Sequence, residues 1–198
     1  MTINTRDQFV AVAARLFAEK GFYGTSIAAI ASELGLTKQA LLHHFGNKEK
    51  LYAEVLKAIS GELDTATEDI LDNGEAPARQ LETLVLTQYR LQMSNPDSAR
   101  LIMRELLDNE QRAQKAGNWY LKPYLEVLVD RVLAIEHLSE IGQARALALV
   151  YQLLGAAHYF AVSQPTLGMI FGDSMMAGTN QVYEQELSAL IRARLAEH

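Results

Sequence analysis

The stretch that decides the fold is TSIAAIASELGLTKQALLHHFGNKEKL, residues 25–51. Its first part, residues 27–34, has apolar side chains at helical spacing. A hydroxyl at Thr25 or Ser26 can accept a hydrogen bond from a free amide of the first turn, so a helix is expected to begin there. Gly35 then ends that helix, because glycine tolerates the left-handed backbone that often follows one.

A second helix is expected after the glycine turn, with Thr37 as its cap. Leu41 and Phe45 lie four residues apart and therefore share one side, which we assign to the core. Gln39 and His43 project from roughly the opposite side, at about 100° per residue. Two short helices joined by a tight turn, the second with a polar free face, are typical of a helix-turn-helix.

The free face of this second helix suits the major groove of double-stranded DNA. Gln39 can bond to adenine in bidentate fashion, Ala40 can contact a thymine methyl and Lys38 can reach a phosphate. Asn47 is expected to cap a third helix, whose first turn carries Lys48 towards the DNA backbone. We expect contact with DNA at Thr25, Ser26, Lys38, Gln39, Ala40, Leu42, His43, His44 and Lys48.

The same spacing also fits an ordinary amphipathic helix pair inside an all-helical protein, since short motifs occur by chance. The distribution of charge favours DNA. Residues 1–57 contain 7 Lys and Arg against 5 Asp and Glu, whereas residues 58–198 contain 11 against 19. A mildly basic segment ahead of an acidic body is consistent with nucleic-acid contact confined to one end.

A family resemblance rests on a larger set of residues between about Phe9 and Leu56. They are Leu16-Phe17, Gly21-Phe22, Thr25-Ser26, Ile30-Ala31, Gly35-Leu36-Thr37, His44-Phe45, Asn47-Lys48 and Leu51. The segment resembles the DNA-binding domain of the tetracycline-repressor (TetR) family of bacterial transcriptional regulators. The chain departs from the family at Leu42, where members usually carry a Tyr that often touches the DNA backbone.

The rest of the chain is expected to be helical too. Only 12 Gly and 4 Pro occur among 198 residues, and no alternating Val, Ile and Thr run predicts a strand. We therefore expect an all-α protein, with an N-terminal three-helix helix-turn-helix DNA-binding domain at residues 1–50 and a helical effector-binding and dimerisation domain at residues 51–198. The chain has no Cys and opens on no signal segment, which favours a cytoplasmic location.

Residues 144–162 are apolar almost all round. The stretch is long enough to suggest a membrane span, but Arg145 and other polar side chains within it would be costly in lipid. We expect instead a soluble helix that starts at Ser139–Glu140 and is buried on two sides. An irregular connector at residues 164–179 should separate it from a last helix capped by Asn180.

The apolar helix has two faces that one chain cannot easily cover. We assign to the interior of the subunit the side that carries Leu147, Val150, Tyr151, Leu154 and His158. The other side combines Leu149, Leu153 and Phe160 with small residues that would let a second helix come close. A homodimer is therefore expected, and in the family the last two helices form such an interface. The residues assigned to it are Ala148, Leu149, Gln152, Gly155, Ala156, Tyr183, Leu187, Leu190 and Ile191.

Aromatic side chains with polar tips are more numerous in the body than a minimal core needs. Each could simply fill the core, but as a set they also fit an effector pocket. His158 could contact a ligand or be a hydrogen-bonded core residue. The residues assigned to the pocket are Tyr89, Met103, Leu106, Trp119, Tyr120, Tyr124, Tyr151 and His158.

The sequence offers no catalytic centre. It contains no phosphate-binding glycine loop, dinucleotide fingerprint, HExxH or GxSxG. Adjacent His43 and His44 cannot face one metal from a regular helix, since neighbours project about 100° apart. We expect no enzyme activity, no metal site and no cofactor.

The expected function is that of a homodimeric transcriptional regulator, most often a repressor in the family it resembles. It would bind an inverted-repeat operator in double-stranded DNA and be released by a small, apolar or aromatic effector. The alternative is a helical small-molecule binding protein without specific DNA recognition. An enzyme on a helical bundle is the least favoured hypothesis.

Overall fold

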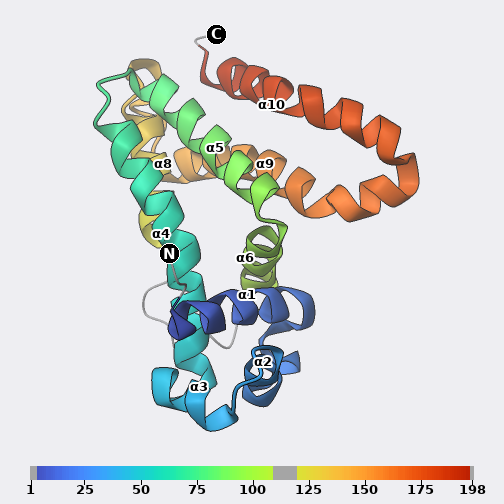
Figure 1. The fold of residues 1–198 in the computed structure, drawn as a ribbon. Coiled ribbons are helices and arrows are strands. Elements are labelled where there is room, and N and C mark those ends of the chain that lie inside the picture. The colour runs from blue at the N-terminus through green and yellow to red at the C-terminus, as the bar shows by residue number, and fades with distance from the viewer. Residues whose placement is uncertain (1–3, 109–119, 197–198) are drawn as a thin grey trace. The chain divides into compact units, whose positions relative to one another are not determined.

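The computed structural model describes residues 4–108 and 120–196, and all the regular structure in these ranges is helical (Figure 1). The predicted all-α class is confirmed. Contacts divide the chain into two units, the first made of residues 1–62 and 97–120 and the second of residues 63–96 and 121–198. The long helix α4 (Lys48–Leu71) contributes to both.

Unit 1 is built around aromatic contacts between α1 and α4. It contains α1 (Thr5–Gly24), α2 (Ile27–Glu33), α3 (Lys38–Phe45), the first part of α4, and α6 (Pro96–Asp108). The large apolar side chains of α1 are buried, with Phe9 and Phe17 fully inaccessible. The rings of Phe17 and Phe22 lie 4.9 and 5.0 Å from that of Tyr52 on α4. Helix α4 therefore shares one core with α1.

The backbone of α1 breaks at Gly21. Gly21 has a φ of 73°, and one further helical turn follows up to Gly24. A side chain at position 21 would be strained, and its Cβ would lie 3.3 Å from Nη1 of Arg104 on α6. The break turns the end of α1 towards α2.

Unit 2 has α5 (Pro77–Ser94) at its centre. The other members are the end of α4, α8 (Lys122–Leu133), the 3₁₀ turn η1 (Glu136–Leu138), α9 (Gln143–Phe171) and α10 (Asp173–Leu195). Helices α8, α9 and α10 all contact α5 (Figure 1). The buried side of α5 carries Leu81, Leu84 and Val85, and the hydroxyl of Tyr124 on α8 donates to the carbonyl oxygen of Leu84 over 3.1 Å.

The predicted connector between the last two helices is wrong. Helix α9 continues through Pro165 to Phe171, so residues 164–179 are almost entirely helical, and Asn180 lies inside α10 and caps nothing. The turn is made at Gly172, which has a φ of 80°. The sequence places several glycines in this region, and nothing in their order shows which one adopts a left-handed backbone.

Helix α9 begins at Gln143, after η1, and not at Ser139–Glu140 as the sequence predicts. By length and composition alone it could cross a membrane, although 44% of its most apolar window is buried inside the protein. A long core helix of a globular protein meets the same two criteria.

The buried face of α9 also differs from the predicted one. Leu149, Leu153 and Phe160, predicted to face a partner, are buried within the subunit at 8%, 1% and 7% exposure, whereas Leu147 and Tyr151 are 42% and 48% exposed. A helix that is apolar almost all round has no periodicity to orient it. The small side chains of Ala146 and Ala157 are fully buried among these residues and allow close approach to the neighbouring helices.

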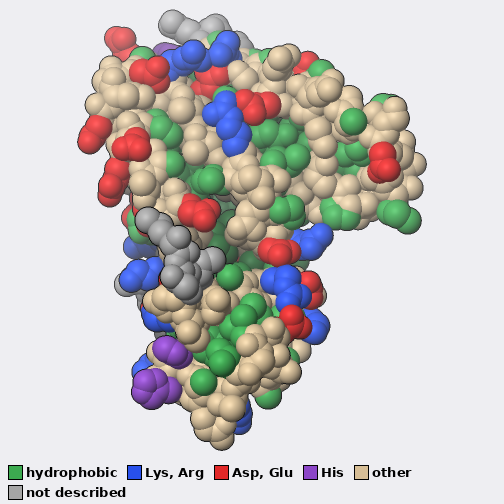
Figure 2. Space-filling model, in the orientation of Figure 1, with side chains coloured by type: hydrophobic (Ala, Val, Ile, Leu, Met, Phe, Trp, Pro, Cys, Tyr) green, Lys and Arg blue, Asp and Glu red, His purple; other side chains and the backbone are tan. Residues whose placement is uncertain are grey.

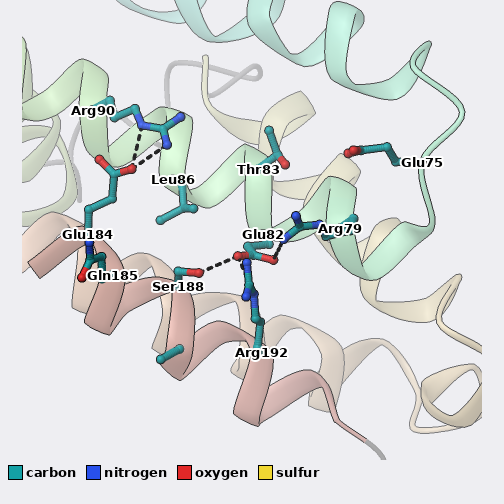
Figure 3. A pocket seen from close by; sticks show the side chains of 11 residues that line it. Glu75, Arg79, Glu82, Thr83, Leu86, Arg90, Glu184, Gln185, Ser188 and Arg192 are labelled. Carbon is teal, nitrogen blue, oxygen red and sulfur yellow. Dashed lines mark hydrogen bonds and ion pairs between the residues drawn. The ribbon is translucent and has the colours of Figure 1, made fainter.

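A buried carboxylate joins α5 to α10 (Figure 3). Glu82 accepts hydrogen bonds from Oγ of Ser188 at 2.6 Å, from Nε of Arg192 at 2.9 Å and from Nη1 of Arg79 at 2.8 Å. Burial alone would raise the pKa of Glu82, but these hydrogen bonds lower it to about 2. Glu82 therefore stays ionised and links the two helices beside an open groove of about 540 Å³.

Candidate nucleic-acid interface

Hydrogen-bonded caps fix α2 and α3 at their N-termini. Oγ of Ser26 accepts from the amide of Ala29 at 3.0 Å, and Oγ1 of Thr37 accepts from the amide of Ala40 at 3.2 Å. Gly35, between the helices, has a φ of 65°. The predicted helix-turn-helix geometry is therefore present, with Ser26 rather than Thr25 as the first cap.

Helix α3 is anchored by its two large buried side chains. Leu41 is fully inaccessible and Phe45 is 5% exposed. The ring of Phe45 lies 6.2 Å from that of Phe9 on α1, in an edge-to-face arrangement. The ring of His44 also contacts Phe9, at 5.8 Å, although His44 is exposed. These contacts set the rotation of α3 about its own axis.

The opposite face of α3 is polar and open. Lys38, Gln39 and His43 are exposed, while Ala40 and Leu42 are partly exposed. Histidine side chains gather on the surface over α3 (Figure 2). Within the described residues, the side chains of Lys38 and Gln39 have no hydrogen bond or ion pair. Their donors and acceptors remain available to base edges and phosphates.

The prediction of a DNA contact by the Thr25 side chain is wrong in this structure. Thr25 is 2% exposed, and its hydroxyl donates towards the carbonyl oxygens of Leu16 and Gly21, at 3.0 and 2.9 Å. It therefore stabilises the break of α1 at Gly21. The sequence places Thr25 beside the true cap, and the two hydroxyls cannot be told apart by pattern alone.

Lys48 also makes hydrogen bonds within unit 1. Its ammonium group donates to the carbonyl oxygens of Phe22 and Thr25, at 2.9 and 3.1 Å, and lies 4.3 Å from the centre of the Phe22 ring. An ammonium has three donors, so one remains for a phosphate. Asn47 caps α4 as predicted, accepting from the amide of Lys50 at 2.8 Å.

Comparison with known proteins finds a match in the same part of the chain. Residues 9–55 match the family model described as bacterial regulatory proteins of the tetR family. Over these residues the chain is similar to the TetR family. The match covers α1 to α3 and the start of α4, the elements that form the interface described above.

Two curated TetR-like relatives extend the comparison. The HTH-type transcriptional repressor KstR2 of Rhodococcus jostii is 34% identical over 84 residues, 42% of this chain and 41% of that protein. The HTH-type transcriptional repressor NicS of Pseudomonas putida is 26% identical over 144 residues, 72% of this chain and 65% of that protein. The matched segment thus spans less than half the length of KstR2.

Solved structures share the fold over the whole chain. A TetR-like transcriptional regulator from Rhodococcus sp. RHA1 superposes with a TM-score of 0.69 at 20% identity, covering 100% of both chains. The regulator FadR of Bacillus subtilis, solved in complex with stearoyl-CoA, gives a TM-score of 0.67 at 20% identity, covering 96% of this chain and 95% of that one. At such identity the likeness concerns the fold alone.

The residues assigned to a TetR-type effector pocket fall in both units. In unit 2, Tyr89, Tyr124 and His158 are buried at 4%, 4% and 6% exposure. Burial raises the pKa of Tyr124, which keeps its hydroxyl protonated. Tyr151 is 48% exposed and so lies at the surface of unit 2, and its assignment to the pocket stays a prediction. Met103, Leu106 and Tyr120 belong to unit 1, and Trp119 lies outside the described residues.

The residues assigned to the dimer interface divide into two groups. Leu149, Leu187 and Ile191 are buried within the subunit at 8%, 2% and 0% exposure, so their assignment to the interface is wrong. Tyr183 is partly buried, since its ring stacks on Phe160 at 3.6 Å and its hydroxyl donates to the carbonyl oxygen of Ala156. The exposed members are Ala148, Gln152, Gly155 and Leu190.

The sequence did not indicate the structural role of Arg104 in unit 1. Arg104 on α6 donates from Nε to the carbonyl oxygen of Ala18 at 2.9 Å and from Nη2 to that of Glu19 at 3.0 Å. The guanidinium thereby caps the end of α1, which carries part of the interface core. No local pattern in the sequence joins residues so far apart.

Proposed function

We propose that this chain is a DNA-binding transcriptional repressor that binds an inverted-repeat operator as a homodimer. The observation that carries the proposal is α3, a capped helix with one face locked in the core and the other presenting Lys38, Gln39 and His43 without obstruction. The match of this segment to the tetR family supports it. Binding to DNA would place the protein in the cytoplasm.

Each of these side chains has a distinct expected task. The carboxamide of Gln39 can donate to and accept from adenine at once, which discriminates among base pairs. His43, four residues and about one helical turn further along the same face, reaches the next base edges. Lys38 and the free donor of Lys48 contact phosphates, which hold the register of the helix but carry no sequence information.

The exposed apolar surface of unit 2 supports a homodimer, with an interface shifted from the predicted one. On α9, Gly155 and Tyr159 lie opposite the buried face, and Tyr159 is 71% exposed. On α10, Met175, Val182 and Leu190 are 60%, 49% and 43% exposed along one stripe. Exposed apolar area of this kind marks an association surface. A second copy would cover both stripes.

The dimer sets the spacing of the two α3 helices. A fixed dimer places them roughly 34–36 Å apart, or a multiple of this distance, so that they enter successive major grooves. A small molecule would release the DNA by binding better to a conformer with another spacing. The relatives named as repressors support this sign of regulation.

Footprinting on the DNA beside its own gene tests the proposal. We expect protection of two half-sites related by inversion, at a protein concentration that gives dimers. Protection of a single half-site would contradict the dimeric arrangement, and absence of protection at low ionic strength would contradict DNA binding altogether.

A further inference from the structure

Three amide side chains in unit 2 bury polar atoms that lack a partner. Gln88 and Gln92 on α5 are 5% and 3% exposed. Within the described chain no group bonds to Oε1 of Gln88, to Oε1 or Nε2 of Gln92, or to Nε2 of Gln164 on α9, although all four atoms are buried. Native proteins rarely leave buried polar atoms unpaired, because each loses its hydrogen bonds to water without replacement.

The two glutamines of α5 continue a core stripe. Leu81, Val85, Gln88 and Gln92 follow one another at four, three and four residues, so they line one side of the helix. All four are at most 5% exposed. Arg90, which pairs with Glu184 on α10, projects from nearly the opposite side. The stripe is thus apolar in its first half and polar in its second, inside the protein.

Helix α9 shows the same change from apolar to polar. Its buried residues Leu153, Ala157 and Ala161 precede Gln164 on one side of the helix. The rings of Tyr89 on α5 and Phe160 on α9 lie 6.4 Å apart, which fixes where the two helices meet. Gln92 and Gln164 each follow these rings by about one turn.

The third glutamine of α5, Gln80, has the hydrogen bonds expected of a purely structural amide. Gln80 is 4% exposed, but its Nε2 donates to the carbonyl oxygens of Ile70 and Leu71, at 3.3 and 3.1 Å, and its Oε1 accepts from Arg131 at 3.1 Å. Gln80 satisfies its donors and acceptor within the protein. Gln92 satisfies none of them.

We propose that Gln88, Gln92 and Gln164 form the polar end of the effector site and bind an uncharged group that both donates and accepts hydrogen bonds. A carboxamide or a hydroxyl on an otherwise apolar molecule has this chemistry. The inference rests on the proposed function only for the role of the ligand as an effector; the binding itself does not require DNA.

The lack of a compensating charge argues for a neutral group. Of the buried side chains described in unit 2, Glu82 is the one carboxylate, and its oxygens are bonded to Arg79, Ser188 and Arg192. No Lys or Arg is among those buried side chains. A charged ligand group placed against amides alone would lose its hydration without an opposite charge.

Melting temperatures of the full chain test the inference, with Gln80→Leu as the matched control for Gln92→Leu. Without ligand, Gln92→Leu should leave the melting temperature unchanged or raise it by up to about 4 °C, because it removes an unpaired buried amide. Gln80→Leu should lower it, because it leaves the carbonyl oxygens of Ile70 and Leu71 unpaired. Equal losses in the two variants would overturn the proposal.

Two probes of equal length then test the ligand chemistry. Octanamide should raise the melting temperature of the wild type and have at least tenfold weaker affinity for Gln92→Leu, whereas octanoate should bind poorly to both. Equal binding of octanoate, undiminished binding of octanamide by Gln92→Leu, or no binding of octanamide by the wild type would overturn the proposal. DNA binding is measured separately on the same proteins, so that a failure of the proposed function can be distinguished from a failure of the proposed ligand site.

Discussion

Arg104 donates a hydrogen bond from Nε to the carbonyl oxygen of Ala18 across 86 residues of sequence. Its Nη2 bonds in the same way to Glu19. Both carbonyl groups lie in the last turn before the break at Gly21, where helix carbonyls lack intrahelical partners and the helix dipole is negative. Arg104 therefore supplies to α1 the C-terminal cap that its own sequence does not provide.

Replacing Arg104 by Ala is expected to destabilise unit 1 by about 1–3 kcal/mol, since two charge-assisted hydrogen bonds are lost. Urea unfolding of the full chain, followed by circular dichroism, measures the change. Arg100→Ala is the control, because Arg100 lies on the same helix but pairs with Asp97 at the surface, at 3.4 Å. The control should lose at most about 1 kcal/mol. Similar losses in both variants would refute the capping role.

Lys48→Ala is expected to have two effects. It should destabilise unit 1 by about 1–3 kcal/mol, because the carbonyl oxygens of Phe22 and Thr25 lose a charged donor. It should also reduce the slope of log affinity against log salt by about 1, if the third donor binds phosphate. Lys50→Ala removes a neighbouring exposed cation and serves as the control for stability. An unchanged salt slope in Lys48→Ala would leave Lys48 with a structural role alone.

Gly155→Leu is expected to prevent dimer formation while the subunit stays folded. A Cβ built at Gly155 meets nothing within 4 Å inside the subunit, so the added side chain can clash only with a second copy. Gly61→Leu on α4 is the control, since a Cβ at Gly61 also meets nothing within 4 Å and Gly61 lies on neither α9 nor α10. Sedimentation velocity distinguishes the outcomes. A stable dimer of Gly155→Leu would exclude this face of α9 from the interface.

The loss of folding stability at acidic pH should depend on Glu82. Its pKa is about 2 in the folded protein, against 4.5 for the ordinary group, so its stabilisation is complete above pH 4.5 and is lost as the pH falls towards 2. The full difference corresponds to about 3 kcal/mol. Glu82→Gln should flatten the stability profile between pH 5 and about 2. Glu126→Gln, at an exposed pair with Lys122, should leave it unchanged. An equally steep profile in Glu82→Gln would refute the assignment.

The DNA-binding elements could be predicted because their signals are local. The cap at Thr37, the turn at Gly35 and the pair Leu41 and Phe45 are all recognisable within ten residues or so, and the structure confirms α3 and its buried face. Local signals could not show that the side chains of Thr25 and Lys48 make hydrogen bonds within unit 1. Their hydrogen-bond partners are carbonyl oxygens whose positions depend on the break at Gly21.

The C-terminal helices were harder to orient because their signals are not local. Helix α9 is apolar on nearly every side, so periodicity gave no preferred face, and packing of Ala157 and Leu153 against neighbouring helices decides it. The buried amides that we propose for the effector site could not be identified from the sequence for a related reason. The sequence alone does not show that Gln92 is buried, because most glutamines are exposed to solvent.

Selection of binding sequences from a random duplex library at low ionic strength tests the central claim most directly. We predict that the wild-type protein enriches an inverted repeat whose half-sites lie one or more helical turns apart, and that Gln39→Ala and His43→Ala keep this spacing but change the preferred bases. Enrichment of no common sequence, or of a repeat whose bases are unaffected by both substitutions, would contradict the account of α3 as the helix that reads DNA.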